Sequence, residues 1–238
     1  MKKQLLICTL FAGFIGAAQA EPAQDLAAAA KKLTAAKNYT WSSSSAWGER
    51  EARTTSGKTG SGGHTHLTIP MRDNSVEVLI RGGKVAFKSD DGWQIASADA
   101  EGDENRRFRF LARMAANYEA PTKRLAELIE KAGDLKVEEG TYSATLSEEA
   151  AKEMMRFRGR RRGRDGQDRQ PPPINGAAGS VKFLVKDGTL TKYELSLSGK
   201  MTFNDQERDI SRTTTVEFSK VDSTSFDISE EAAGLLAE

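Results

Sequence analysis

An alternation of apolar and polar residues between Thr191 and Phe203 is the clearest pattern in the chain. Every second residue is apolar or small, and the residues between them are polar. A period of two indicates a β-strand with one face in water. At roughly 3.3 Å for each residue, this stretch spans about 43 Å, whereas a usual strand has about 5–6 residues. We therefore expect the strand to curve or to wrap around another part of the molecule.

Turn sequences predict hairpins on either side of this pattern. A two-residue turn at 82–83 pairs Ile80 with Val85 and Val78 with Phe87, which places the apolar side chains of both arms on one face. At each of two Asp-Gly sequences we expect a three-residue loop that ends in a left-handed glycine. These loops would pair Phe87 with Ile95 and Phe183 with Thr191, so that the odd positions of the long strand face inward.

The remaining pattern predicts an ordered succession of helices and strands. It comprises a helix (22–37), a strand around Trp41, a polar glycine-rich connection (49–63), a strand around Leu67, the hairpin and its third arm, helices around Leu111 and Leu125, one strand (134–146), a short helix capped by Ser147, three long strands, a short strand (226–228) and a terminal helix that begins at Ser229.

The first twenty residues have the three parts of an export signal in order. A charged start at 2–3 precedes an apolar run at 5–15 that is too short to anchor the chain in a bilayer, and 18–20 is a small-x-small cleavage sequence. We expect cleavage after Ala20 and a mature protein in the periplasm or outside the cell, without a transmembrane segment. Cys8 lies inside the signal, so the mature chain has no thiol for disulfides, catalysis or zinc.

The mature chain is nearly neutral and long enough for one core. The whole chain has 35 basic and 34 acidic residues, and removal of Lys2 and Lys3 leaves 33 against 34, a net charge of about −1. This balance argues against a protein that binds nucleic acid over its whole surface. We expect a single domain over 21–238.

A stretch at 156–173 combines arginine, glycine and three consecutive prolines, a composition that cannot pack a core. It predicts a flexible loop at 158–176. The loop is either merely solvated or binds an anionic membrane surface or an envelope partner through its arginines. Phe157 is its sole aromatic residue, which argues against stacking on bases. The arginines are Arg156, Arg158, Arg160, Arg161, Arg162, Arg164 and Arg169.

Candidate catalytic and metal-binding residues are few. His64 and His66 share a face of a predicted strand, but the pattern offers no third ligand, so we expect no metal site. The sequence at 57–59 resembles the end of a phosphate loop, yet Ala52 stands where the motif needs glycine, and no helix is predicted to follow. We therefore expect neither an enzyme nor a protein with a cofactor.

Arg212 has the same parity as Val216 and Phe218, which places its charge on the predicted apolar face. An unpaired charge is unfavourable in such surroundings. Two interpretations remain open: a local change of register near the turn at 204–205, or an anchor for the headgroup of an amphiphile.

Several stretches together resemble the LolA/LppX-type superfamily of exported lipid and lipoprotein carriers. They are the opening helix before the sequence at 38–41 (NYTW), the central helices, the sequence at 185–199 (VKDGTLTKYELSLSG) and the sequence at 212–221 (RTTTVEFSKV). The resemblance implies an α+β fold in which a strongly curved antiparallel sheet forms an unclosed half-barrel, with helices packed on its concave face around a hydrophobic cavity. It implies no catalytic residues. The Arg/Gly/Pro stretch departs from the family, so lipoprotein sorting does not follow.

The first functional hypothesis is a non-catalytic carrier that buries a lipid or other amphiphile in an apolar cavity, and the alternative is an envelope protein that docks through the arginine-rich loop. The inward side chains could instead fill a compact core. The predicted cavity residues are Val78, Ile80, Phe87, Phe183, Tyr193, Leu195, Leu197, Met201, Phe203, Arg212, Val216 and Phe218.

Overall fold

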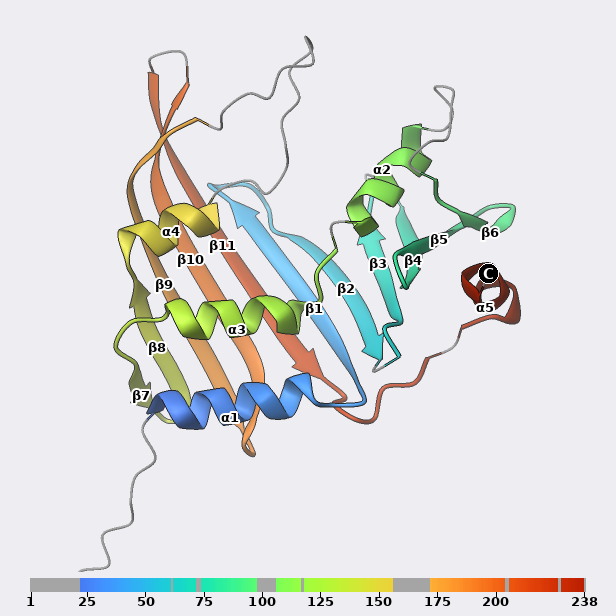
Figure 1. Cartoon of the computed structure of the whole chain (residues 1–238). Coiled ribbons are helices and arrows are strands. Elements are labelled where there is room, and N and C mark those ends of the chain that lie inside the picture. Colours follow the sequence, from blue (N-terminus) through green and yellow to red (C-terminus); the bar gives the residue numbers. More distant parts are fainter. Residues whose placement is uncertain are drawn as a thin grey trace, which may run out of the picture.

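The protein is an open antiparallel sheet with helices on its faces (Figure 1). The computed structural model describes residues 22–60, 62–71, 74–97, 106–116, 118–155, 172–203, 206–226 and 228–237. The predicted signal peptide and the arginines of 156–169 lie outside these ranges. Among the described residues there are eleven strands and five helices, which confirms the predicted α+β class and the antiparallel sheet.

The strands follow one another as two meanders that meet along one seam. Their spatial order is β6-β5-β4-β3-β2-β1-β11-β10-β9-β8-β7, so only the β1–β11 pair joins strands from the two ends of the described chain. The strands are β1 (Asn38–Trp47), β2 (Arg53–Gly60), β3 (Thr65–Pro70), β4 (Ser75–Arg81), β5 (Lys84–Ser89), β6 (Gly92–Ile95), β7 (Lys136–Glu138), β8 (Thr141–Leu146), β9 (Ile174–Lys186), β10 (Thr189–Phe203) and β11 (Gln206–Ser219).

The helices cover different parts of the sheet. Figure 1 shows α1 (Pro22–Thr34), α3 (Pro121–Lys131) and α4 (Glu148–Met155) across the β7–β11 half, while α2 (Arg106–Ala116) lies by β3 to β5. Helix α5 (Glu230–Ala237) packs on the opposite face of β4 and β5, against Leu79 and Ala86. The helix predicted at 22–37 is confirmed as α1, and its residues Leu26, Ala29, Ala30 and Leu33 are buried in the main core.

Strand β10 is the long strand that the alternation predicts, and its odd positions face the helices. Tyr193, Leu195, Leu197 and Met201 are all buried. The side chain of Phe203 lies outside the described part of the structure.

The predicted loop before β10 is wrong in its register. The turn at 187–188 has two residues, both with positive φ, of 50° and 65°. A bulge between Leu190 and Lys192 then shifts the pairing, so that Phe183 faces Tyr193 instead of Thr191. The extra residue allows Leu190 and Tyr193 to point to the same buried side, which strict alternation forbids.

The predicted three-residue loop after β5 is also wrong, whereas the hairpin at 82–83 has the predicted register. Ser89 pairs with Gly92, so the turn holds two residues and Phe87 pairs with Gln94 instead of Ile95. Both faces of β5 are buried, since α5 covers the side opposite the main core. Alternation cannot fix the register of a strand that is apolar on both faces.

Strand β2 occupies the stretch predicted as a polar connection. It contains no large apolar residue, and its one buried residue is Gly57. Trp41 of the neighbouring strand explains this composition, because a Cβ at position 57 would lie 2.7 Å from the Cζ2 atom of its indole. The strand thus supplies a flat surface for an aromatic ring, and the sequence has no apolar period to reveal it.

Three smaller expectations also differ from the structure. The stretch predicted as one strand at 134–146 is the β7–β8 hairpin, whose turn holds Glu139 and Gly140 at φ of 48° and 77°. Phe226 and Ile228 are outside any strand. Of the predicted loop at 158–176, the last residues belong to β9, which begins at Ile174.

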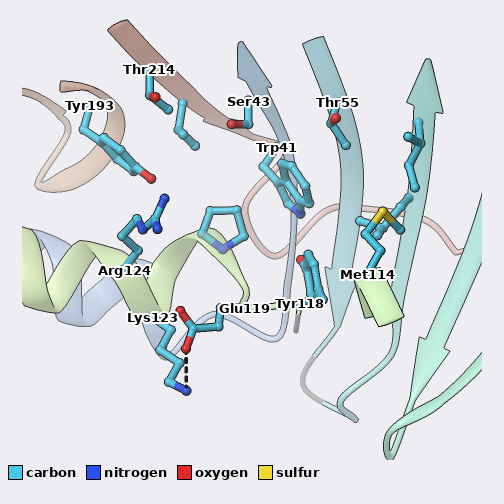
Figure 2. Close-up of a pocket in the computed structure, with 14 residues that line it drawn as sticks. Trp41, Ser43, Thr55, Met114, Tyr118, Glu119, Lys123, Arg124, Tyr193 and Thr214 are labelled. Carbon is cyan, nitrogen blue, oxygen red and sulfur yellow. Dashed lines mark ion pairs between the residues drawn. The ribbon is translucent and has the colours of Figure 1, made fainter. Parts of the chain in front are cut away.

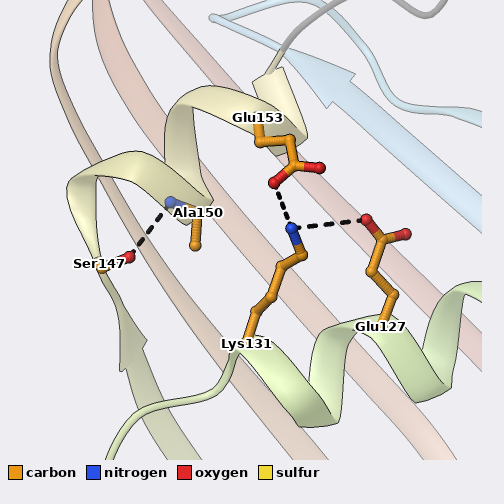
Figure 3. A network of polar contacts seen from close by, with 5 residues as sticks. All are labelled: Glu127, Lys131, Ser147, Ala150 and Glu153. Carbon is orange, nitrogen blue, oxygen red and sulfur yellow. Dashed lines mark hydrogen bonds and ion pairs between the residues drawn. The ribbon is translucent and has the colours of Figure 1, made fainter.

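Polar contacts hold the short helices in place. The Ser147 hydroxyl accepts a hydrogen bond of 3.2 Å from the backbone N–H of Ala150, the predicted cap of α4. Figure 3 shows Lys131 of α3 between Glu127 of its own helix, 3.8 Å away, and Glu153 of α4. These contacts fix α3 against α4.

Within the described ranges, no helix has the length and hydropathy that a bilayer span requires.

Candidate functional site

A pocket of about 700 Å³ opens on the main-core face of the sheet, between the strands and the start of α3 (Figure 2). Its lining combines apolar and aromatic side chains with a few hydroxyls and charges. The lining residues are Trp41, Ser43, Thr55, Leu67, Ile69, Met114, Tyr118, Glu119, Pro121, Lys123, Arg124, Tyr193, Thr214 and Val216.

The floor of the pocket follows a row of residues that face one another across the strands. Tyr193 of β10 pairs with Val216 of β11, Val216 pairs with Ser43 of β1, and Ser43 pairs with Thr55 of β2. Leu67 and Ile69 of β3 complete the lining on the far side. The pocket therefore crosses four gaps between strands, which is about 19 Å at about 4.8 Å for each gap.

Trp41 lies sideways across the floor because three neighbours fix its indole. Gly57 leaves room beneath the ring, since a Cβ there would lie 2.7 Å from Cζ2. The indole Nε1–H donates a hydrogen bond of 3.1 Å to the Thr59 hydroxyl. Tyr118 stacks on the ring at a centroid distance of 6.3 Å and an angle of 22°. The ring thus presents an apolar surface to the pocket instead of standing upright from the sheet.

The start of α3 forms one wall of the pocket. Pro121 occupies the first helical turn, and the Ala120 cap makes no side-chain hydrogen bond. The buried hydroxyls of Thr122 and Tyr39 are 3.0 Å apart and hydrogen-bonded, which fastens this helix end to β1. The first turn of α3 is therefore held beside the pocket by a tertiary contact as well as by its proline.

Three charged residues line the pocket, and two of them neutralise each other. Lys123 Nζ lies 3.1 Å from a carboxylate oxygen of Glu119. Arg124 is half-buried and makes no hydrogen bond or ion pair with another described residue. Figure 2 shows its guanidinium on the side of the pocket where Tyr193 lies. The pocket thus contains one cation without a counter-charge among the described residues.

Two tyrosine hydroxyls at the pocket have unusual surroundings. Burial raises the pKa of Tyr193 to about 12, although the positive charge of Arg124 opposes the rise. Burial likewise raises the pKa of Tyr118 to about 12, and the neighbouring hydroxyls of Thr59 and Thr65 oppose it. Among the described residues, the buried Tyr118 hydroxyl has no hydrogen-bond partner. Both phenols therefore stay protonated, and their O–H groups remain possible donors.

The predicted cavity residues fall into two groups. Tyr193 and Val216 line the pocket. Most of the others are buried away from the lining of the pocket; these are Val78, Ile80, Phe87, Phe183, Leu195, Leu197, Met201 and Phe218.

Arg212 reaches the inner face as its parity predicts, but it binds the end of a helix. Its Nη2 donates a hydrogen bond of 2.7 Å to the carbonyl of Met154, in the last turn of α4. Its guanidinium lies 5.1 Å from the ring of Trp47. Burial lowers the pKa of Arg212, with a further contribution from the charge of Arg124. A cation at the carbonyl end of a helix is favourable, so this residue stabilises α4.

The two histidines do not form a metal site with other described residues. The Nε2 atom of His66 is 3.1 Å from Oε2 of Glu77, and no group of three or more His, Cys, Asp or Glu in the described ranges could hold a metal ion. The ring of His66 is half-buried, and its centroid lies 6.4 Å from that of Trp93.

A solved structure of a LolA superfamily protein from Nitrosomonas europaea is similar to this one. The match covers 85% of this chain and 93% of that chain, with a TM-score of 0.29 and 9% sequence identity. No family model matches the sequence, and no curated protein matches it. The functional proposal therefore has to rest on the residues of the pocket.

Two features of this site have no sign in the sequence. Arg124 was one of many charged residues on an amphipathic helix, and nothing in its spacing showed that it faces a pocket. Trp41 was assigned to a strand, but its sideways orientation depends on Gly57, which lay in the stretch expected to be a connection. The arginines of the predicted anionic-surface loop lie outside the described residues, and their role stays a prediction.

Proposed function

We propose that the protein binds and carries a lipid or another amphiphile in this pocket and catalyses no reaction. The observation on which this depends is the open pocket of about 700 Å³ that crosses five neighbouring strands. Sites for small molecules are mostly apolar, measure about 300–1,000 Å³ and contain a few polar groups that orient the ligand.

The chemistry of the lining supports an amphiphile over a polar solute. The indole of Trp41, the side chains of Leu67 and Met114 and the ring of Tyr193 provide apolar contacts along the length of the pocket. Burial of an alkyl chain gains roughly 0.8 kcal/mol for each methylene group that leaves water. The charged residues stand at the α3 side, so a ligand with one polar end and one apolar end matches this distribution.

The proposal also covers the shape of the sheet and the location of the protein. We propose that the open sheet acts as a strongly curved, unclosed half-barrel whose concave face carries the helices and the ligand. We further propose that residues 1–20 direct export and are removed after Ala20, so that the carrier works in the periplasm or outside the cell. The signal-like order of charged, apolar and small residues supports this location.

A substitution that fills the pocket tests the proposal. Ser43 stands in the middle of the floor, so Ser43→Phe should occupy the space of the ligand and weaken binding of a fluorescent fatty acid to delipidated protein by about tenfold or more. Ser42→Phe is the matched control, because this neighbour points to the other face of β1. Circular dichroism and thermal unfolding show whether each variant is folded. Failure of the wild-type protein to bind the probe, or equal binding by the two variants, would contradict the proposal.

A further inference from the structure

We infer that the ligand has an anionic headgroup, a carboxylate or a phosphate, held by Arg124 and Tyr193 at the α3 end of the pocket. This inference rests on the proposed function and adds the chemical class of the ligand. Three observations support it: the contacts of the basic residues on α3, the hydroxyl of Tyr193 and the direction of the apolar lining.

The basic residues of α3 differ in their partners. Lys123 is paired with Glu119, and Lys131 lies between two glutamates. Arg124 is half-buried and has no counter-charge among the described residues. Partial burial of an arginine without a counter-charge is unfavourable, because it removes part of the hydration of the charge. An anion from outside the chain would supply the counter-charge that Arg124 lacks among the described residues.

Among the described residues of the pocket lining, no free carboxylate is available to Arg124. Glu119 is the one acidic residue among the described residues of the lining, and it forms an ion pair with Lys123. Burial lowers the pKa of Arg212, and the positive charge of Arg124 contributes further. A bound anion would be favoured beside Arg124, because it would offset that charge.

Tyr193 supplies a neutral donor beside Arg124. The residue is 2% exposed, yet its hydroxyl makes no hydrogen bond with a described residue. Figure 2 shows Arg124 and Tyr193 on the same side of the pocket, and the positive charge of Arg124 opposes the rise that burial causes in the pKa of Tyr193. A planar guanidinium and an O–H group are suited to bind two oxygens of one carboxylate or phosphate.

The apolar lining fixes the direction of the remainder of the ligand. From Tyr193 on β10 the floor continues past Trp41 on β1 to Leu67 on β3. This distance is about 19 Å, which gives an alkyl chain a continuous path away from the charged end. A neutral ligand would leave Arg124 unpaired. An anionic amphiphile would pair its headgroup with Arg124 and place its alkyl chain against the apolar lining.

Calorimetric titration of delipidated protein with matched amphiphiles tests the inference. The probes are dodecanoate, dodecyl phosphate and the uncharged dodecanol, with inorganic phosphate as a free anion. The wild-type protein should bind the two anionic amphiphiles about tenfold or more tightly than dodecanol, because charge-assisted hydrogen bonds contribute to binding of the anions only. Inorganic phosphate should compete weakly, since it lacks the alkyl chain.

Arg124→Gln should remove the preference for the anions and leave the affinity for dodecanol within about twofold of wild type. Arg124→Lys keeps the charge without the bidentate geometry and should retain part of the preference. Arg81→Gln is the matched control, because Arg81 is exposed on β4 and does not line the pocket. It should bind all probes like wild type.

Two outcomes overturn the inference while leaving the proposed function intact: equal wild-type affinity for dodecanoate and dodecanol, or an equal loss of both in Arg124→Gln. Competition by inorganic phosphate as strong as that by dodecyl phosphate also overturns it, because a free anion is then the ligand. Binding of none of the amphiphiles by the wild-type protein overturns the proposed function together with the inference.

Discussion

The contact between Gly57 and Trp41 gives the most specific prediction for the floor of the pocket. In Gly57→Ala, the new Cβ would lie 2.7 Å from Cζ2 and 2.8 Å from Cε2 of the indole, and 3.0 Å from the carbonyl oxygen of His66. Carbon atoms do not approach so closely without repulsion, since their optimal separation is about 3.5–4.0 Å. The indole must therefore move.

The expected loss of stability follows from what holds the indole. Movement would stretch or break the Trp41–Thr59 hydrogen bond, a net contribution of about 1 kcal/mol. Overpacking of a well-filled site adds typically about 1–3 kcal/mol. Replacement of glycine by alanine in a strand offsets about 0.5–1 kcal/mol by restricting the unfolded chain. We expect Gly57→Ala to lower the free energy of unfolding by about 2 kcal/mol, the balance of these contributions.

A double-mutant cycle in urea, followed by circular dichroism, measures this contact. Trp41→Phe removes the two indole atoms nearest to position 57, so in that background Gly57→Ala should be less destabilising by about 1–2 kcal/mol. Gly234→Ala serves as the control, because a Cβ on that helical residue meets no atom within 4 Å. It should be neutral or slightly stabilising.

Two results would refute the reasoning. If Gly57→Ala is neutral in the wild-type background, the indole is not confined as the distances indicate. If the loss is the same with Trp41 and with phenylalanine, the clash involves the His66 carbonyl instead of the indole. In either case the orientation of Trp41 would not depend on the glycine beneath it.

Two further predictions concern tyrosines. Tyr39→Phe leaves the Thr122 hydroxyl buried without its partner and should lower the free energy of unfolding by about 1–2 kcal/mol in urea, whereas Tyr142→Phe, whose hydroxyl has no described partner, should have little effect. Because the pKa values of Tyr118 and Tyr193 are raised to about 12 in the folded protein, the unfolded chain ionises first. The stabilising effect should be complete below the unfolded value of about 10 and decrease between about pH 10 and 12; a tyrosinate titration in which every tyrosine of the folded protein ionises with a midpoint near pH 10 would contradict this.

The sequence predicted those parts of the fold in which one face of a strand is apolar and the other is polar. The odd positions of β10 and the hairpin at 82–83 have such a pattern, so their inward faces were predicted correctly. Strand β2 was missed because its buried surface is the backbone at Gly57, which has no hydrophobic side chain. The predicted register after β5 was wrong because both faces of this strand are buried, so the alternation of apolar and polar residues does not define it. The predicted register before β10 was wrong because the bulge there leaves no trace in the alternation.

The site was less predictable than the fold because it depends on contacts between distant segments. Tyr193 and Val216 could be predicted as inward residues, and both line the pocket. The position of Arg124 depends on the start of α3, which a hydrogen bond between Thr122 and Tyr39 fastens to β1. No spacing within α3 contains that information.

The seam between β1 and β11 links the pocket to the way the chain folds. Paired residues there, such as Thr40 and Ser219, stand near opposite ends of the described chain, so their pairing closes a very long loop. Such non-local pairing is slow, and we expect the two meanders to form before the seam does. Ser43 and Val216 place the floor of the pocket directly on this seam. A ligand in the pocket would contact both meanders and slow hydrogen exchange along the β1–β11 ladder, so occupancy would stabilise the junction between the early and late parts of the chain.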